Sequence, residues 1–243
     1  MKLAVAQSCS TRGDVTLNIE NHIKYAREAS KLGVSYLIFP ELSLTGYELD
    51  AAKEVAFELD DVRLQPLFEA AKDYQISLGV GAPITSQGSL KIGLFVIHKD
   101  GTAEVYEKMH LHEGEEVYFN NGNTYHLIEV GGQRVANAIC ADTTNPSHAK
   151  GCAELGATVY IAGVLVTPQG YAKDASLWSS YAKKHNMLVA IANYNQPSGG
   201  LAAAGKSAVW YGDQLLAQAN EDDDVLVVAQ ITDEGWSAKV YQV

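Results

Sequence analysis

The chain of 243 residues is 47% hydrophobic and 19% charged, which provides enough apolar side chains for one large core. Its formal net charge of −11 disfavours binding to nucleic-acid phosphates or anionic lipid, and the densest basic stretch, residues 181–186, holds only two lysines. We therefore expect a single domain over residues 1–243 that binds neither nucleic acid nor membrane.

Cysteine usage and apolar runs indicate the compartment. The three cysteines, Cys9, Cys140 and Cys152, have no regular spacing, which argues against both a disulfide framework and a zinc-ligand pattern. The amino-terminal apolar run is too short for a signal-peptide core, and no later segment approaches the roughly 18 apolar residues of a membrane span. A cytoplasmic protein is expected.

The first half of the chain alternates apolar strands with helical stretches. Asp14 fits the N-cap of a helix and Gly33 its stop. A strand ends at Phe39, because Pro40 lacks the N–H that a central strand donates. The expected elements are strands at 2–7, 35–39 and 77–83, helices at 14–32 and 64–74, and a hairpin over 91–108 that turns at 99–101.

The second half adds further strands and two helices. A hairpin turns at Gly131-Gly132 and its outgoing strand ends at Cys140, while Pro146 suits the first position of a helix that ends near Gly156. So many strands with few helices favour a layered α/β sandwich of mixed strand direction. The remaining expected elements are a helix at 172–186 and strands at 158–166, 187–193, 206–210, 214–219, 225–231 and 238–242.

Three chemically useful side chains, Glu41, Lys108 and Cys140, lie just beyond predicted strands. Strand ends can converge in one cleft of an α/β fold. If these converge, the thiolate attacks a carbonyl carbon, the carboxylate moves protons, and the ammonium stabilises the oxyanion and lowers the pKa of the thiol. The backbone N–H of Ala141 is a second candidate oxyanion donor. Taken singly, each side chain also has a structural interpretation, since free cysteine is usually a small buried hydrophobe.

Three motifs resemble those of one enzyme family. The stretch "FPELSLTGYE", residues 39–48, resembles the glutamate motif of the nitrilase superfamily of carbon-nitrogen hydrolases. "YEKMHLHEGEEVYFNNG", residues 106–122, is similar to its lysine motif, and "NAICADTTNP", residues 137–146, to its cysteine motif. The resemblance implies a four-layer αββα sandwich with two mixed β-sheets, and a homodimer or higher homo-oligomer. Further similar stretches lie at 2–7, 191–193 and 205–210.

The resemblance also implies roles for individual residues. Glu41 would be the general base and acid, Lys108 the cation that stabilises the oxyanion, and Cys140 the nucleophile that forms a thioester. A second active-site glutamate would be Glu115, with Glu116 as the alternative; both also fit an ordinary solvated acidic run. Such chemistry uses a small-molecule substrate and water and needs no metal or organic cofactor.

The cysteine motif bears on the substrate. Cys140-Ala141-Asp142 resembles the amidase-type branches more than the Cys-Trp-Glu of nitrile-cleaving relatives. Thr143 and Thr144 follow Asp142, where the commonest arrangement of the family has a basic residue that some relatives use to hold a substrate carboxylate, which weakens the case for an acidic amide. We expect hydrolysis of a small linear amide to a carboxylic acid and ammonia. Hydrolysis of a nitrile or an N-carbamoyl compound is the alternative.

Candidate pocket residues are Tyr47, from the Thr-Gly-Tyr turn, together with Thr143 and Thr167. Thr167 also fits a simple turn before Pro168.

The same residues allow other functional interpretations. A glycosidase pair formed by Glu41 and Glu115 would leave Lys108 and Cys140 without a role. His110 and His112 alternate on one side of an extended segment, but no Cys/His cluster completes a metal site. A non-catalytic small-molecule binding protein on the same fold remains the alternative from a different class.

Overall fold

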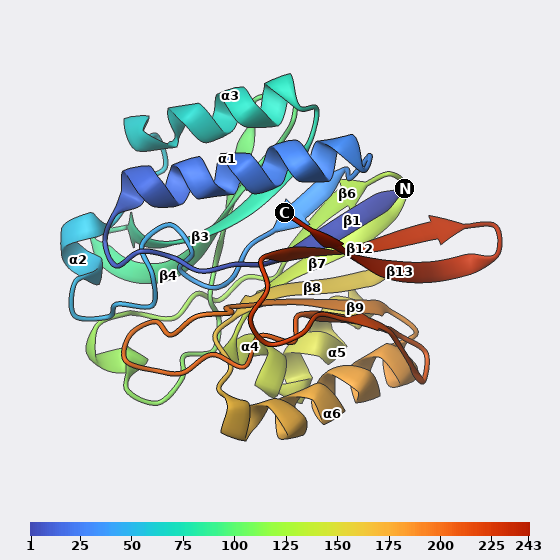
Figure 1. Cartoon of the computed structure of the whole chain (residues 1–243). Coiled ribbons are helices and arrows are strands. Elements are labelled where there is room, and N and C mark those ends of the chain that lie inside the picture. Colours follow the sequence, from blue (N-terminus) through green and yellow to red (C-terminus); the bar gives the residue numbers. More distant parts are fainter.

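The computed structural model describes residues 1–243 and has two β-sheets packed face to face between layers of helices (Figure 1). Helices α1 (Val15–Lys31) and α3 (Gln65–Asp73) cover the outer face of one sheet. Helices α5 (Pro146–Glu154) and α6 (Pro168–His185) cover the outer face of the other. This order of layers confirms the αββα sandwich that the sequence predicts.

The first sheet has seven strands in the order β13-β12-β1-β2-β3-β4-β5. β1, β2 and β3 are parallel to one another, while the remaining pairs are antiparallel, so the sheet is mixed. Its strands are β1 (Lys2–Gln7), β2 (Tyr36–Ile38), β3 (Ser77–Ser86), β4 (Ser89–Ile97), β5 (Ala103–Glu107), β12 (Val225–Thr232) and β13 (Gly235–Gln242).

The second sheet has six strands in the order β11-β10-β9-β8-β7-β6. β7, β8 and β9 are parallel, and the pairs at the two edges are antiparallel. Its strands are β6 (His126–Val130), β7 (Gln133–Ile139), β8 (Val159–Val164), β9 (Leu188–Asn193), β10 (Ala208–Tyr211) and β11 (Gln214–Gln218).

Alternation along the strands separates three layers of apolar packing. In β1, Leu3 and Val5 pack between the two sheets, whereas Ala4 and Ala6 face the helices of the first sheet. Successive side chains of a strand point to opposite faces, so a strand that is covered on both sides is apolar at every position. The same rule explains why β1 and β8 are nearly continuous hydrophobic runs.

Two helical features differ from the sequence prediction. α6 begins at Pro168 rather than at residue 172, because the Thr167 side chain caps the helix by accepting a hydrogen bond from the Gly170 N–H. A short helix, α4 (Ala141–Thr144), follows Cys140 directly and was not expected. The other short helical segments are α2 (Ala52–Val55) and the 3₁₀ turns η1 (Val62–Leu64) and η2 (Glu115–Val117).

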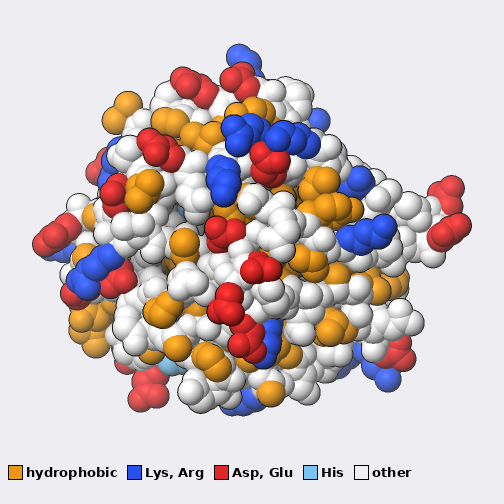
Figure 2. All heavy atoms as spheres, in the orientation of Figure 1, with side chains coloured by type: hydrophobic (Ala, Val, Ile, Leu, Met, Phe, Trp, Pro, Cys, Tyr) orange, Lys and Arg blue, Asp and Glu red, His pale blue; other side chains and the backbone are white.

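The surface fits the acidic composition. Figure 2 shows Asp and Glu side chains in a row near the middle of one face, with Lys and Arg gathered mainly over the region of α1. None of the helices combines the length and the hydropathy that crossing a bilayer requires.

Candidate active site

Three strand ends from two sheets meet at one place. Glu41 follows β2 and Lys108 follows β5, both in the seven-stranded sheet, whereas Cys140 follows β7 in the six-stranded sheet. Gly163 of β8 permits this meeting, because a Cβ there would collide with the carbonyl oxygen of Phe39. The backbone that leads to Glu41 therefore lies directly against the second sheet.

Lys108 is held between two carboxylates. Its Nζ lies 2.6 Å from Oε1 of Glu41, and 2.8 and 2.7 Å from the two carboxylate oxygens of Glu115. All three side chains are fully buried. Burial acts against the ammonium, but the charges of Glu41, Cys140 and Glu115 outweigh it and raise the pKa of Lys108. The lysine is therefore a fixed cation.

Glu41 is the carboxylate of this cluster that is suited to proton transfer. Burial raises its pKa to about 7, against the opposing charge of Lys108 and with support from Glu115. Its Oε1 accepts a hydrogen bond from Lys108, while Oε2 is buried without a hydrogen-bond partner. Near neutral pH this carboxyl group can therefore both accept and release a proton.

Cys140 lies at a strained junction between β7 and α4. Its φ of 40° is in the left-handed region, which residues other than glycine rarely adopt. Its Sγ is 3.8 Å from the carbonyl oxygen of Leu165. Burial and the charge of Glu41 raise the pKa of the Cys140 thiol well above its usual value, although Lys108 lowers it. Lys108 thus lowers the pKa of the thiol, as expected from the sequence, but burial outweighs this effect.

The two candidate second glutamates have different environments. Glu115 is buried, and its Oε1 accepts a hydrogen bond from the Tyr47 hydroxyl at 2.6 Å. Its Oε2 accepts another from the backbone N–H of His112 at 2.8 Å. Glu116 is exposed and accepts a hydrogen bond from the N–H of Gly114. Of these two glutamates, Glu115 is therefore the one that contacts Lys108. Glu116 fits the alternative of an ordinary solvated acidic residue.

A pocket with a volume of about 450 Å³ opens above Cys140. Tyr47, Thr167 and Ala141 line it, as the sequence analysis expects for the first two. Thr143 does not line it, because its buried hydroxyl donates a hydrogen bond to the carbonyl oxygen of Cys140 at 2.7 Å. The other lining residues are His112, Cys140, Thr144, Leu165, Val166, Gly170, Lys173, Asp174 and Leu201.

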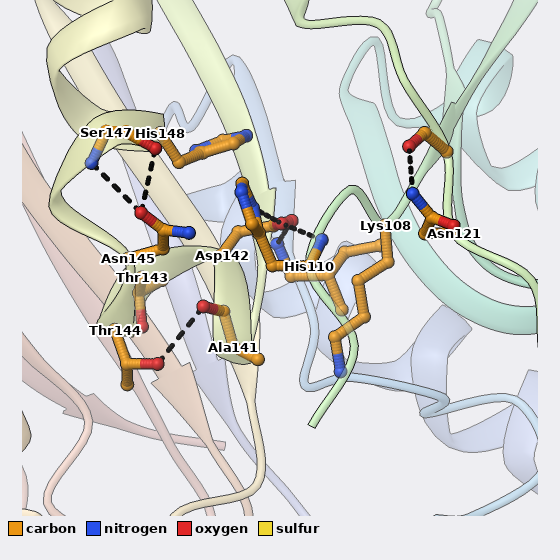
Figure 3. Close-up of polar contacts among 12 residues, drawn as sticks. Lys108, His110, Asn121, Ala141, Asp142, Thr143, Thr144, Asn145, Ser147 and His148 are labelled. Carbon is orange, nitrogen blue, oxygen red and sulfur yellow. Dashed lines mark hydrogen bonds and ion pairs between the residues drawn. The ribbon is translucent and has the colours of Figure 1, made fainter. Parts of the chain in front are cut away.

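Asp142 is a buried residue to which the sequence analysis assigned no role. Its carboxylate accepts hydrogen bonds from the Tyr106 hydroxyl at 2.6 Å and the Ile139 N–H at 3.0 Å. It also faces His110, whose backbone N–H and ring Nδ1 lie 2.8 and 3.0 Å away (Figure 3). Tyr106 and His110 belong to the lysine motif, whereas Ile139 ends β7 just before Cys140, so the sequence offers no signal for the network beyond the position of Asp142 in the cysteine motif.

The histidines flagged by sequence do not form a metal site. His110 pairs with Asp142, His112 is exposed at the pocket, and no group of three or more His, Cys, Asp or Glu residues is arranged to hold a metal ion.

Known proteins similar to the chain include enzymes of several activities. An (R)-stereoselective amidase from Pseudomonas sp is 26% identical over 230 residues, which cover 92% of this chain and 82% of that protein. A nitrilase from Pyrococcus abyssi is 28% identical over 223 residues, which cover 86% of this chain and 80% of that protein. A glutamine-dependent NAD(+) synthetase from Aquifex aeolicus is 30% identical over 251 residues, but the match covers only 42% of that longer protein and 94% of this chain.

The fold and a family model give a consistent assignment. An amidase from Nesterenkonia sp. AN1 has the same fold, with a TM-score of 0.87 at 23% identity over 96% of this chain and 93% of that chain. The model of the carbon-nitrogen hydrolase family matches residues 2–239. The chain therefore belongs to the carbon-nitrogen hydrolase family.

Proposed function

We propose that this hydrolase cleaves a small linear amide to a carboxylic acid and ammonia, through a thioester on Cys140. The observation that carries the proposal is the buried cluster in which Lys108 bridges Glu41 and Glu115 beside the cysteine. A structural ion pair needs only one carboxylate, but this cluster has two, and one of them, Glu41, has a pKa of about 7. A strained cysteine lies beside the cluster at the floor of a pocket.

Acylation begins with transfer of the Cys140 thiol proton to Glu41. The sulfur then forms a bond to the amide carbon, and the carbonyl oxygen becomes an oxyanion that Lys108 and the N–H of Ala141 stabilise. The Ala141 N–H is available because it is the first residue of α4 and has no acceptor within that helix. When the carbonyl re-forms, the C–N bond breaks, and Glu41 gives its proton to the nitrogen, which leaves as ammonia.

Deacylation follows the same steps, with water as the nucleophile in place of the thiol. Glu41 removes a proton from the water molecule, whose oxygen attacks the thioester carbon. The C–S bond then breaks, the carboxylic acid is released, and the proton on Glu41 returns to the sulfur of Cys140. Glu115 holds Lys108 in place during both half-reactions, and Tyr47 and the His112 N–H fix the orientation of Glu115.

The pocket favours a small substrate. Its volume of about 450 Å³ and the apolar side chains of Leu165, Val166 and Leu201 suit a short acyl chain. Two mutants of the amidase from Nesterenkonia sp. AN1, which shares the fold, have solved structures: one shows Michael addition of acrylamide at the active-site cysteine, and the other is in complex with butyramide. Short aliphatic amides are therefore the first substrates to test.

A substrate panel tests the proposal. The protein is incubated with butyramide, butyronitrile and an N-carbamoyl amine, and ammonia release is followed together with the intact mass of the protein. Ammonia from butyramide and an acyl adduct that disappears in Cys140→Ala are expected. Faster ammonia release from the nitrile or the N-carbamoyl compound would show that this compound, and not the amide, represents the substrate class. A complete lack of ammonia and of any Cys140 adduct would favour a binding protein over an enzyme.

A further inference from the structure

The pocket above Cys140 is lined by one lysine and one aspartate, and they are consecutive in α6. Lys173 is exposed, whereas Asp174 is half-buried. The long flexible side chain of a lysine can keep its ammonium in water, whereas the short side chain of an aspartate holds its carboxylate close to the helix. Asp174 is therefore the charge that a molecule inside the pocket meets.

Asp174 has no partner within the protein. No hydrogen bond or ion pair involves its carboxylate, and Lys173 does not pair with it because adjacent residues of a helix point in different directions. Gly170, one turn earlier, leaves the carboxylate uncovered: a Cβ at Gly170 would lie 3.9 Å from Oδ2 of Asp174 and 3.6 Å from Oγ1 of Thr167. The carboxylate and this hydroxyl therefore share one side of the first turns of α6.

We propose that Asp174 selects amides that carry a positively charged ammonium group, which its carboxylate binds while the amide carbon lies at Cys140. This inference rests on the proposed amidase function and names its substrate class. An ionised carboxylate only accepts hydrogen bonds, and its bonds to an ammonium are about twice as strong as those between neutral groups. An acidic amide would instead be repelled by Asp174.

The remaining charges at the pocket agree with this selectivity. Burial raises the pKa of Asp174, and the charges of Lys173 and His112 lower it. The hydroxyl of Thr144 donates to the carbonyl oxygen of Ala141, and Thr143 lies outside the pocket. Thr143 and Thr144 thus offer a substrate carboxylate no cation, and the lysine that lines the pocket, Lys173, is exposed.

The test uses amides that differ in charge. Butyramide is neutral, 3-aminopropanamide has the same number of heavy atoms with an ammonium in place of the terminal methyl, and succinamate carries a carboxylate. The kcat/KM ratio of 3-aminopropanamide to butyramide is measured for the wild type, Asp174→Asn and Lys173→Gln. Asp174→Asn keeps the shape and removes the charge, and Lys173→Gln removes the neighbouring charge instead.

We expect the wild type to favour 3-aminopropanamide, and Asp174→Asn to lower the ratio by about ten-fold or more, mainly through KM. In Lys173→Gln the ratio stays at or above the wild-type value. Equal use of both amides by the wild type, or a uniform loss on both in Asp174→Asn, would overturn the inference. So would a preference for succinamate that Lys173→Gln abolishes.

Binding to Cys140→Ala separates this inference from the proposed function. Calorimetric titration with the same amides reports charge selectivity without any turnover. Stronger binding of 3-aminopropanamide that disappears in the double variant Cys140→Ala/Asp174→Asn supports the role of Asp174, even if the wild type releases no ammonia. Turnover of butyramide without any preference for the cationic amide leaves the amidase function intact and overturns the inference about Asp174.

Discussion

The carboxylate of Asp142 and the residue His110 are joined at two points, through the backbone N–H at 2.8 Å and the ring Nδ1 at 3.0 Å. Asp142 follows Cys140 by two positions, and His110 follows Lys108 by two positions. The pair therefore links the segment that carries the cysteine to the segment that carries the lysine. Figure 3 shows this link between the two segments.

Removing the Asp142 carboxylate should loosen both segments. Asp142→Ala leaves the N–H groups of Ile139 and His110 without this acceptor and leaves the Tyr106 hydroxyl with only Nε2 of His148, 2.9 Å away, and we expect a loss of about 3 kcal/mol in unfolding free energy. Asp142→Asn keeps one acceptor and should lose less. Urea titration measures stability, and kcat should fall more than KM rises. An Asp142→Ala protein with wild-type stability and kcat would contradict the link.

The same carboxylate should give a pH-dependent contribution to stability. Burial acts against its charge, but hydrogen bonds from His110 and Tyr106 and the charge of His148 hold the pKa of Asp142 below its usual value. A depressed carboxyl pKa stabilises the fold above the unfolded-state pKa, and this contribution is lost as the pH falls through the folded-state value. The stability difference between wild type and Asp142→Asn should therefore shrink below about pH 4. A difference that stays constant as the pH falls well below about 4 would argue against it.

Activity should rise with pH through the titration of Glu41. The raised pKa of Glu41, about 7, means that this group must lose its proton before it can accept one from Cys140. We expect kcat/KM for butyramide to increase between about pH 6 and pH 8 and then level off. Because Glu41, Lys108 and Cys140 interact, the observed pKa belongs to the group of residues. A rate that decreases over this range would reverse the assigned direction of proton transfer.

Removing Lys108 should be severe for both stability and rate. Lys108→Ala leaves Glu41 and Glu115 buried without their cation, which costs about 3–5 kcal/mol of unfolding free energy unless a proton is taken up. Loss of an oxyanion donor should lower kcat by about 100-fold or more. Glu116→Gln is the matched control, since Glu116 is exposed and does not contact Lys108. Urea titration and single-turnover ammonia release measure the two effects.

The strained backbone at Cys140 should lower the free energy of unfolding. Its φ of 40° costs about 1–3 kcal/mol in a residue with a side chain and little in glycine. Cys140→Gly should therefore unfold with about 1 kcal/mol more free energy than Cys140→Ala, after allowance for the flexibility of glycine in the unfolded chain. Neither variant should form an acyl adduct. A glycine variant less stable than the alanine variant would show that the backbone there is unstrained.

Much of the fold could be predicted from the sequence because strands buried on both faces leave long apolar runs. β1 was predicted with its observed bounds, and the hairpins at residues 99–101 and Gly131-Gly132 were also predicted. The start of α6 was missed because its first turn is set by the cap at Thr167 rather than by apolar periodicity. Glu41, Lys108 and Cys140 were predicted to lie together because each follows a strand and lies in a recognisable motif, and the structure places them at one site.

Other parts of the site depend on contacts between distant segments. Thr143 was placed in the pocket, but the unexpected helix α4 turns its hydroxyl back to the chain. Lys173 and Asp174 lie on a helix whose polar side chains look alike in the sequence, and only packing shows that these two line the pocket above Cys140. Local patterns therefore identify reactive residues better than residues that shape the pocket.

The division of the site between two sheets has a consequence for mutations far from it. Glu41 and Lys108 are carried by one sheet and Cys140 by the other, so the spacing between the sheets sets the distance from base to nucleophile. That spacing is fixed by the buried side chains between them, Ile161 of β8 and Val5 of β1 among them. The packing between the sheets therefore determines the distance between Glu41 and Cys140, and a change in that packing can lower the reaction rate even when stability is unchanged.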